Sequence, residues 1–285
     1  MMPMSHDPGS RAIARAFSGA LVGLWLLWCG WPSQAASAKD VPTQGRILAT
    51  YEVDLASFNL GEFRLNAKFK GSSYEMQGDG EFSLFLGRVY KSSGTATSTG
   101  RLTKVGPESS SFTVSFEGAD NKEKRRLSFA GGDVSKVSIV PPKKGIGRNR
   151  VPVTKDQLVD VLDPLSAAFL HARADDSVCE GTLPVFDGRL RFDLVLTPKR
   201  AERLPGEAPQ GLSGPVAVCN VKFVAVGGYK PDNAAIKYLS QTDQIEAWLV
   251  RLPQTTLYVP YWIGVPTPLG RGGATLTQIE IKLKP

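Results

Sequence analysis

Apolar and polar side chains alternate through residues 46–70, RILATYEVDLASFNLGEFRLNAKFK. A period of two places successive side chains on opposite faces of a strand, so one face is buried and the other is wet. Ser57-Phe58-Asn59 interrupts the alternation and predicts a turn. The stretch therefore predicts an antiparallel hairpin at the start of a β-rich domain.

Further strand-like segments make up most of the remaining chain. These segments are separated by turns rich in Gly and Pro. The segments span residues 74–86, 89–101, 108–117, 122–129, 134–140, 182–197, 216–226, 244–251, 256–265 and 274–284. Short turns between neighbouring strands favour a meander over a Greek key.

Residues 154–169 have a different pattern. Apolar side chains fall there at helical spacing, and Asp163-Pro164 interrupts the run. This predicts two short helices, or one kinked helix, with a single apolar face. We expect a mainly β fold, in which a curved antiparallel meander forms an open barrel or β-spiral. The helical segment is expected to cover its mouth or concave face.

The first 38 residues have the features of a cleavable secretory signal. Arg11 and Arg15 precede an apolar run at 16–31, and Ala36-Ser37-Ala38 fits the small-x-small pattern, so we place the cut after Ala38. The run is shorter than the roughly 18 residues of a spanning helix. A lipidated Cys29 would make the protein membrane-anchored, but Cys29 follows the large Trp28 inside the apolar run.

We therefore expect a single periplasmic domain over residues 39–285, without a transmembrane segment. The alternative of two domains needs a linker, and the only candidate, 141–150, leads directly into the helical segment. Of the three cysteines, Cys179 and Cys219 remain after cleavage. In an oxidising compartment they predict a disulfide, which would close a loop of about 40 residues with an entropic stabilisation of about 4 kcal/mol. The tight spacing of a redox or metal pair is absent.

The sequence offers little for catalysis. His171 is the one histidine outside the signal, which excludes a His-rich zinc site, and we expect it as a cation near a helix C-terminus rather than a general base. Asp187 and Asp193 would lie about 20 Å apart along a strand, too far for paired-carboxylate glycoside hydrolysis. Asp187-Gly188 instead indicates a turn or bulge, and Asp193 a pair with an arginine. We expect no enzymatic activity, no cofactor and no metal.

Two groups of residues are candidates for binding. An apolar ligand groove would be lined by Tyr258, Tyr261, Trp262, Phe82 and Phe85, although such runs also form core. Anionic headgroups or an acidic partner would contact the basic loop, although it also fits a solvated loop. Its basic residues are Lys143, Lys144, Arg148 and Arg150, and a second basic run has Lys122, Lys124, Arg125 and Arg126. A net charge of +7 is too small to indicate nucleic-acid binding.

Several motifs resemble a bacterial exported family known as a domain of unknown function, DUF3108. They are DPLSAAF at 163–169, VFDGRLRF at 185–192, the Cys219 strand with Gly227-Gly228-Tyr229, and PTPLG at 266–270. The resemblance implies a periplasmic curved sheet, similar in shape to lipoprotein-carrier half-barrels and to the β-spiral envelope-integrity proteins of alphaproteobacteria. It implies no activity and no catalytic residue.

The resulting expectation is a non-enzymatic periplasmic protein of the cell envelope. Its curved sheet would bind an apolar or amphipathic ligand, such as a lipid or a lipoprotein segment, or an envelope partner. The alternative is a structural or interaction protein of envelope maintenance with a filled core. A third hypothesis of function is an envelope hydrolase.

Overall fold

A computed structural model describes residues 42, 44–56, 58–85, 89–118, 122–142, 149–172 and 177–284. The predicted signal peptide, Cys29 and the basic residues Lys143, Lys144 and Arg148 lie outside the described residues. The same is true of the Phe85 side chain.

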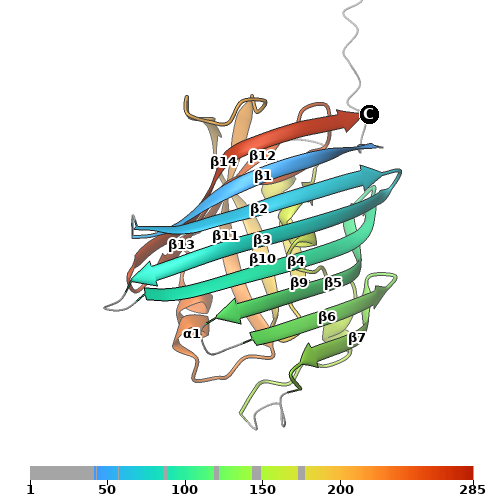
Figure 1. The fold of residues 1–285 in the computed structure, drawn as a ribbon, viewed down its shortest axis with the longest axis vertical. Helices are drawn as coiled ribbons and strands as arrows, with labels where there is room; N and C mark the ends of the chain where they lie inside the picture. The colour runs from blue at the N-terminus through green and yellow to red at the C-terminus, as the bar shows by residue number, and fades with distance from the viewer. Residues whose placement is uncertain are drawn as a thin grey trace, which may run out of the picture. The chain divides into compact units, whose positions relative to one another are not determined.

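The described strands form one antiparallel sheet of 14 strands, and the first seven are a meander that runs from its middle to one end (Figure 1). These strands are β1 (Gln44–Leu55), β2 (Phe58–Lys70), β3 (Ser73–Phe85), β4 (Val89–Thr103), β5 (Gly106–Gly118), β6 (Lys122–Ala130) and β7 (Asp133–Val140). The predicted hairpin of residues 46–70 is β1 and β2, and the predicted meander is confirmed.

The second half of the chain runs inward from the other end of the sheet. Its strands are β8 (Leu170–His171), β9 (Gly181–Phe186), β10 (Arg191–Arg203), β11 (Pro215–Gly227), β12 (Ile245–Arg251), β13 (Leu257–Thr267) and β14 (Gly270–Lys284). The first and last strands meet in the middle, where Ile47 of β1 lies opposite Ile281 of β14. The pairing order ends at β7 and β9, so the sheet does not close into a barrel. The predicted fold class is therefore confirmed.

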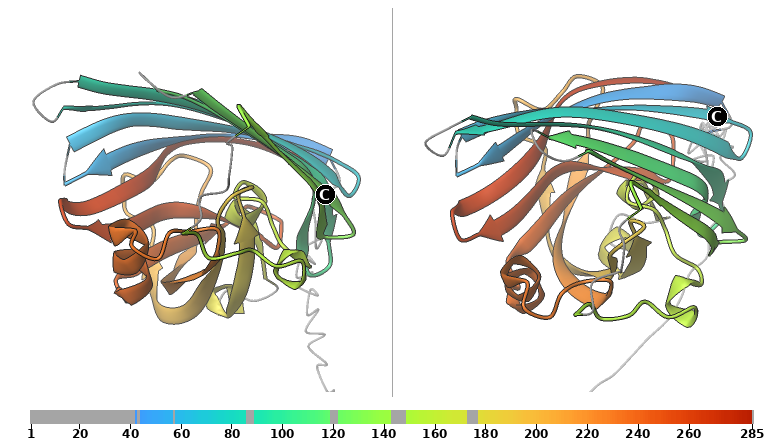
Figure 2. Two further views of the ribbon diagram at one scale, coloured as in Figure 1. Left: turned by 90° about the horizontal axis from the view of Figure 1, so that it is seen from below. Right: turned by 60° about the horizontal axis from the view of Figure 1, so that its bottom comes forward.

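Residues 149–172, which we call the covering segment, lie under the curved sheet (Figure 2). They contain two short 3-10 turns, η1 (Asp156–Leu158) and η2 (Ser166–Ala168). The prediction of α-helices there is wrong. The Asp163 carboxylate accepts hydrogen bonds from the backbone of Leu165 and Ser166, which holds the chain in a local turn after Pro164.

The one α-helix of the described residues was not predicted. It is α1 (Ala234–Gln241), and the Asn233 side chain caps it by accepting a hydrogen bond from the Ile236 backbone. Ile236 and Leu239 pack on the apolar cluster around the disulfide. Eight residues contain only two turns, which is too short for a clear apolar periodicity.

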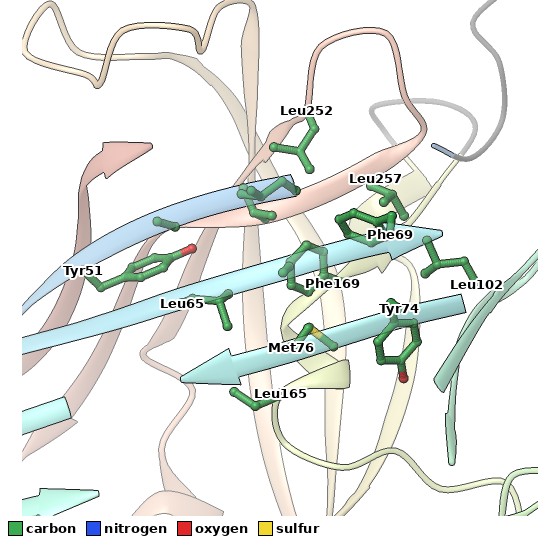
Figure 3. Close-up of a cluster of buried hydrophobic side chains, with 14 of the residues drawn as sticks. Tyr51, Leu65, Phe69, Tyr74, Met76, Leu102, Leu165, Phe169, Leu252 and Leu257 are labelled. Atoms are coloured by element: carbon green, nitrogen blue, oxygen red, sulfur yellow. The ribbon is translucent and has the colours of Figure 1, made fainter. Parts of the chain in front are cut away.

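The main core lies between the concave face and the covering segment (Figure 3). Phe169 of the covering segment meets Phe69 of β2 edge-on, with ring centroids 6.1 Å apart. Leu165 packs in the same cluster as Leu65 and Met76. The covering segment thus fills this part of the concave face with its own side chains.

A buried polar network fixes the covering segment to the sheet. Asp163 is 0% exposed, and its carboxylate accepts hydrogen bonds from the hydroxyls of Ser98 on β4 at 2.8 Å, Ser109 on β5 at 2.7 Å and Ser166 at 2.5 Å. The Tyr74 hydroxyl of β3 lies 2.6 Å from Ser166 Oγ. Burial, together with the Asp163 charge, raises the pKa of Tyr74 to about 12.

The covering segment also joins the two ends of the sheet. Leu162 forms a parallel bridge with Val185 of β9, and the Val161 backbone donates to the carbonyl of Gly132, beside β7. Close to this point, Arg125 of β6 forms an ion pair of 2.6 Å with Asp187 in the β9–β10 turn. The two end strands are therefore linked through a segment and an ion pair rather than through direct pairing.

Candidate ligand-binding cleft

A cleft of about 510 Å³ opens where the β4–β5 turn faces the covering segment and the start of β9. This volume lies within the range of about 300–1,000 Å³ that is typical of small-ligand sites. It is lined by residues 103 and 105–108 at the β4–β5 turn, residues 160–162 and 169–171 of the covering segment, residues 177–178 and 180–184, and the single residues Gly132 and Leu196.

About half of the residues that line the cleft are apolar, and polar groups lie among them. Val161 and Phe169 are buried in the covering segment, and Leu183 is half-buried on β9. Val105, at the tip of the β4–β5 turn, is 91% exposed. Exposed Glu180 also lines the cleft. A few polar groups in an apolar cleft are the usual composition of a ligand site.

A disulfide positions one wall. Cys179 ends the short turn η3 (Ser177–Cys179) and is bonded to Cys219 of β11, with the sulfurs 2.03 Å apart. Both half-cystines are buried in the second apolar cluster, together with Val178. The predicted disulfide is confirmed, and it ties the segment before β9 to the sheet.

His171 has a different environment from the expected one. It belongs to β8, where it pairs with Leu257 of β13, and it lines the cleft. The expected helix C-terminus does not exist, because the chain after η2 is extended at Phe169. Sequence spacing could not show this, since a two-residue strand has no periodicity.

The two candidate carboxylates have structural roles. Asp187 closes the β9–β10 turn by accepting hydrogen bonds from the backbone of Arg189 and Leu190, at 2.8 and 2.7 Å. Gly188 follows with φ of +92°, a conformation that favours glycine. Asp193 pairs with Arg191 at 2.5 Å, as the sequence predicted.

The candidate aromatic residues are divided between the core and the surface. Tyr258 and Tyr261 are core residues, 1% and 8% exposed. Trp262 packs edge-on against Trp248, with Arg271 over its ring. Phe82 lines a separate cleft of about 740 Å³ at the ends of β2–β5, to which the other three do not contribute.

Most of the described basic candidates form hydrogen bonds or ion pairs with other residues of the chain. Arg150 donates a hydrogen bond to the Gly228 carbonyl, and Arg125 pairs with both Glu123 and Asp187. Lys122 forms a surface ion pair with Glu117. The remaining two, Lys124 and Arg126, are exposed on β6.

Apart from His171, the residues that line the cleft were not among the candidates from the sequence. One signal was present: Val105 is a large apolar residue in the polar turn Lys104-Val105-Gly106. The other lining residues come from segments that are remote in sequence, and only folding brings them together.

Comparison with known proteins places the chain in a family. The model of a protein of unknown function, DUF3108, matches residues 50–277. The chain belongs to the DUF3108 family. The match covers every strand of the sheet, at least in part.

The fold of this DUF3108 protein is similar to a solved structure of another family. That structure is a beta-barrel-like protein of domain of unknown function DUF1849 from Brucella abortus. Its TM-score is 0.50 at 9% sequence identity, over 86% of this chain and 100% of the other. At this identity the likeness shows the fold alone. No match was found among curated proteins.

Within the described residues of this DUF3108 structure, no helix has the length and apolar character needed to cross a membrane. The same residues contain no group of three or more His, Cys, Asp or Glu side chains arranged to hold a metal ion.

Proposed function

We propose that this DUF3108 chain is a non-enzymatic binding protein of the bacterial cell envelope, and that the cleft beside β9 holds the apolar part of an amphipathic ligand. The observation that carries the proposal is the cleft itself, about 510 Å³ in volume, in which apolar side chains from distant parts of the chain meet beside polar groups. The export signal and the disulfide support an oxidising compartment such as the periplasm.

Covalent and polar contacts hold the walls of the cleft in place, which favours ligand binding there. The disulfide fixes the wall at η3, and the Asp163 network fixes the covering segment. A preformed site loses little conformational entropy when a ligand binds. The side chains of Val161 and Phe169 are held by the core on one side and line the cleft on the other.

The binding test uses N-phenyl-1-naphthylamine (NPN), a neutral apolar probe whose fluorescence rises in apolar surroundings. The mature chain should give a saturable rise that corresponds to one site. Leu183→Trp, which fills the cleft, should weaken binding about tenfold or more, whereas Val137→Trp on β7 should bind as the unchanged chain does. Equal binding by Leu183→Trp and the unchanged chain would contradict the proposal.

A second function is favoured by the filled concave face. Because Leu165 and Phe169 occupy this face, it supports the alternative of a solid scaffold that contributes to envelope maintenance through its surface. The two functions differ in a complementation experiment. If Leu183→Trp restores detergent resistance to a deletion strain as well as the natural chain does, the cleft is dispensable and the surface function holds.

A further inference from the structure

One edge of β9 is only partly paired. Leu162 donates its backbone N–H to the Pro184 carbonyl at 2.8 Å and accepts a hydrogen bond from the Phe186 N–H at 2.9 Å. The Leu162 pairing therefore uses the side of β9 that faces away from β10. On a strand, the N–H and C=O of one residue point to the same side, and this side alternates along the chain.

Thr182 extends this edge beyond the part that Leu162 covers. It lies two residues before Pro184, so its N–H and C=O point away from β10 as well. Thr182 is exposed and lines the cleft. The cleft thus combines apolar walls with a donor and an acceptor of a strand edge, which are the two elements that bind an extended peptide by strand addition.

The rim of the cleft carries negative charge, although the whole chain has a net charge of +7. Asp160 and Glu180 both line the cleft and are exposed. Asp133 lies beside Asp160, because its carboxylate accepts a hydrogen bond from the Asp160 N–H. A fourth carboxylate, Glu108, is neutralised by Arg101 at 2.7 Å. The rim therefore complements a cationic ligand.

We propose that the cleft binds an extended peptide segment that adds to the edge of β9 at Thr182 and carries an apolar side chain next to a basic one. This inference rests on the proposed function of the cleft and names its ligand class. The peptide continues an arrangement that already exists in the chain, because Leu162 occupies the next position on the same edge. An acyl chain would use the apolar walls but neither the strand edge nor the acidic rim.

The first test changes the backbone edge. The probe is a fluorescein-labelled peptide of lysine, valine, leucine, valine and lysine, followed by fluorescence anisotropy. Thr182→Pro removes the N–H that faces the cleft and should weaken binding about three- to tenfold, the effect of one hydrogen bond. Thr182→Val keeps the N–H and should bind the peptide more tightly than Thr182→Pro does. Pro184 occupies the equivalent position on the strand, so proline is compatible with this edge.

The second test changes the rim and does not depend on how Thr182→Pro folds. Asp160→Asn combined with Glu180→Gln should weaken the lysine peptide about three- to tenfold at low salt, and the difference should shrink as salt is added. Asp160 has φ of +48°, which asparagine tolerates. Asp156→Asn combined with Asp232→Asn removes two exposed charges outside the cleft and should leave binding unchanged. A peptide with glutamates in place of the lysines should bind more weakly than the lysine peptide.

The outcomes separate the two proposals. If NPN binds but the lysine peptide does not, or if Thr182→Pro and Thr182→Val bind it equally, the peptide inference is wrong and the apolar cleft stands. If the unchanged chain binds neither NPN nor the peptide, both proposals are wrong.

Discussion

The hydroxyl of Tyr74 lies 2.6 Å from that of Ser166, and this contact joins the third strand of the sheet to a segment 92 residues further along the chain. Ser166 in turn contacts Asp163, whose carboxylate is shared by serines of β4 and β5. The carboxylate is completely buried and fully surrounded by donors, which is the condition under which a buried charge is tolerated. The covering segment is therefore held by polar bonds as well as by apolar packing.

Replacing Asp163 should destabilise the whole domain. Asp163→Ala leaves three hydroxyls and two backbone N–H groups without their acceptor in a buried site. The free energy of unfolding should fall by about 3 kcal/mol or more, measured by urea denaturation. Asp156→Ala, at an exposed position of the same segment, should change it by less than about 0.5 kcal/mol. A similar small effect for both variants would show that the network contributes little.

Gly100 should not tolerate a side chain. It lies opposite Tyr74 on the neighbouring strand, and a methyl group there would lie 2.2 Å from the Glu108 carbonyl oxygen and 2.3 Å from the Tyr74 hydroxyl oxygen. Gly100→Ala should displace the phenol, break its contact with Ser166 and lower the free energy of unfolding by about 2 kcal/mol. In the double variant Gly100→Ala, Tyr74→Phe, the loss of unfolding free energy should be smaller than the sum of the two single losses, because the contact between Tyr74 and Ser166 can be lost only once. Fully additive effects in this double-mutant cycle would contradict the explanation.

Alkaline pH should weaken the fold through its buried phenols. The pKa of Tyr74 is raised to about 12 by burial and by the Asp163 charge, and burial also raises the pKa of Tyr51. A raised pKa in the folded state means that the stabilisation is complete below the unfolded value of about 10 and is lost as pH rises towards 12. Urea denaturation at pH 9, 10, 11 and 12 should show this decline. Tyr74→Phe should flatten it, and an unchanged slope would exclude Tyr74 as a cause.

The disulfide should be required for the wall of the cleft. Mature protein should show no free thiol when it is denatured without reductant, because Cys179 and Cys219 are bonded. The double variant Cys179→Ala, Cys219→Ala should lose about 4 kcal/mol of stability. This double variant should bind NPN more weakly than the control Val137→Trp, because η3 is then no longer tied to β11. Intact NPN binding at temperatures where the variant remains folded would show that the wall is positioned by packing alone.

The ion pair of Arg125 and Asp187 should contribute to the link between the ends of the sheet. Both side chains are partly buried, and Arg125 also pairs with Glu123. Arg125→Met keeps the apolar stem but removes the charge, and it should lower the free energy of unfolding by about 1–3 kcal/mol. Lys122→Met removes an exposed partner of Glu117 on the same strand and should have an effect below about 1 kcal/mol. Thermal unfolding of the two variants provides the comparison.

Local patterns predicted the strands well and the connecting segments poorly. The alternation in residues 46–70 predicted the β1–β2 hairpin, because side-chain burial on a half-covered sheet repeats every two residues. At 154–169 the same reasoning failed. The apolar spacing there matched a helix, but the Asp163 side chain bonds the backbone next to Pro164 and gives a turn instead.

The candidate site was predicted only in part. Asp193 was expected to pair with an arginine and does so, because its partner Arg191 is two residues away on the same strand. The cleft was not predicted, because Val105, Leu183 and Phe169 come from three distant parts of the chain. Export and periplasmic location stay predictions from residues 1–38.

The sequence by itself determined most of the strands and the pairing of Cys179 with Cys219, although it predicted one strand at 182–197 where the turn at Asp187 separates β9 from β10. Each of these follows from short-range periodicity or from composition. Tertiary structure alone decided that β1 pairs with β14, that Asp163 enters the core, and that the edge of β9 at Thr182 faces a cleft. These contacts join residues far apart in the chain, and their energy depends on which surfaces fold against each other rather than on any local pattern.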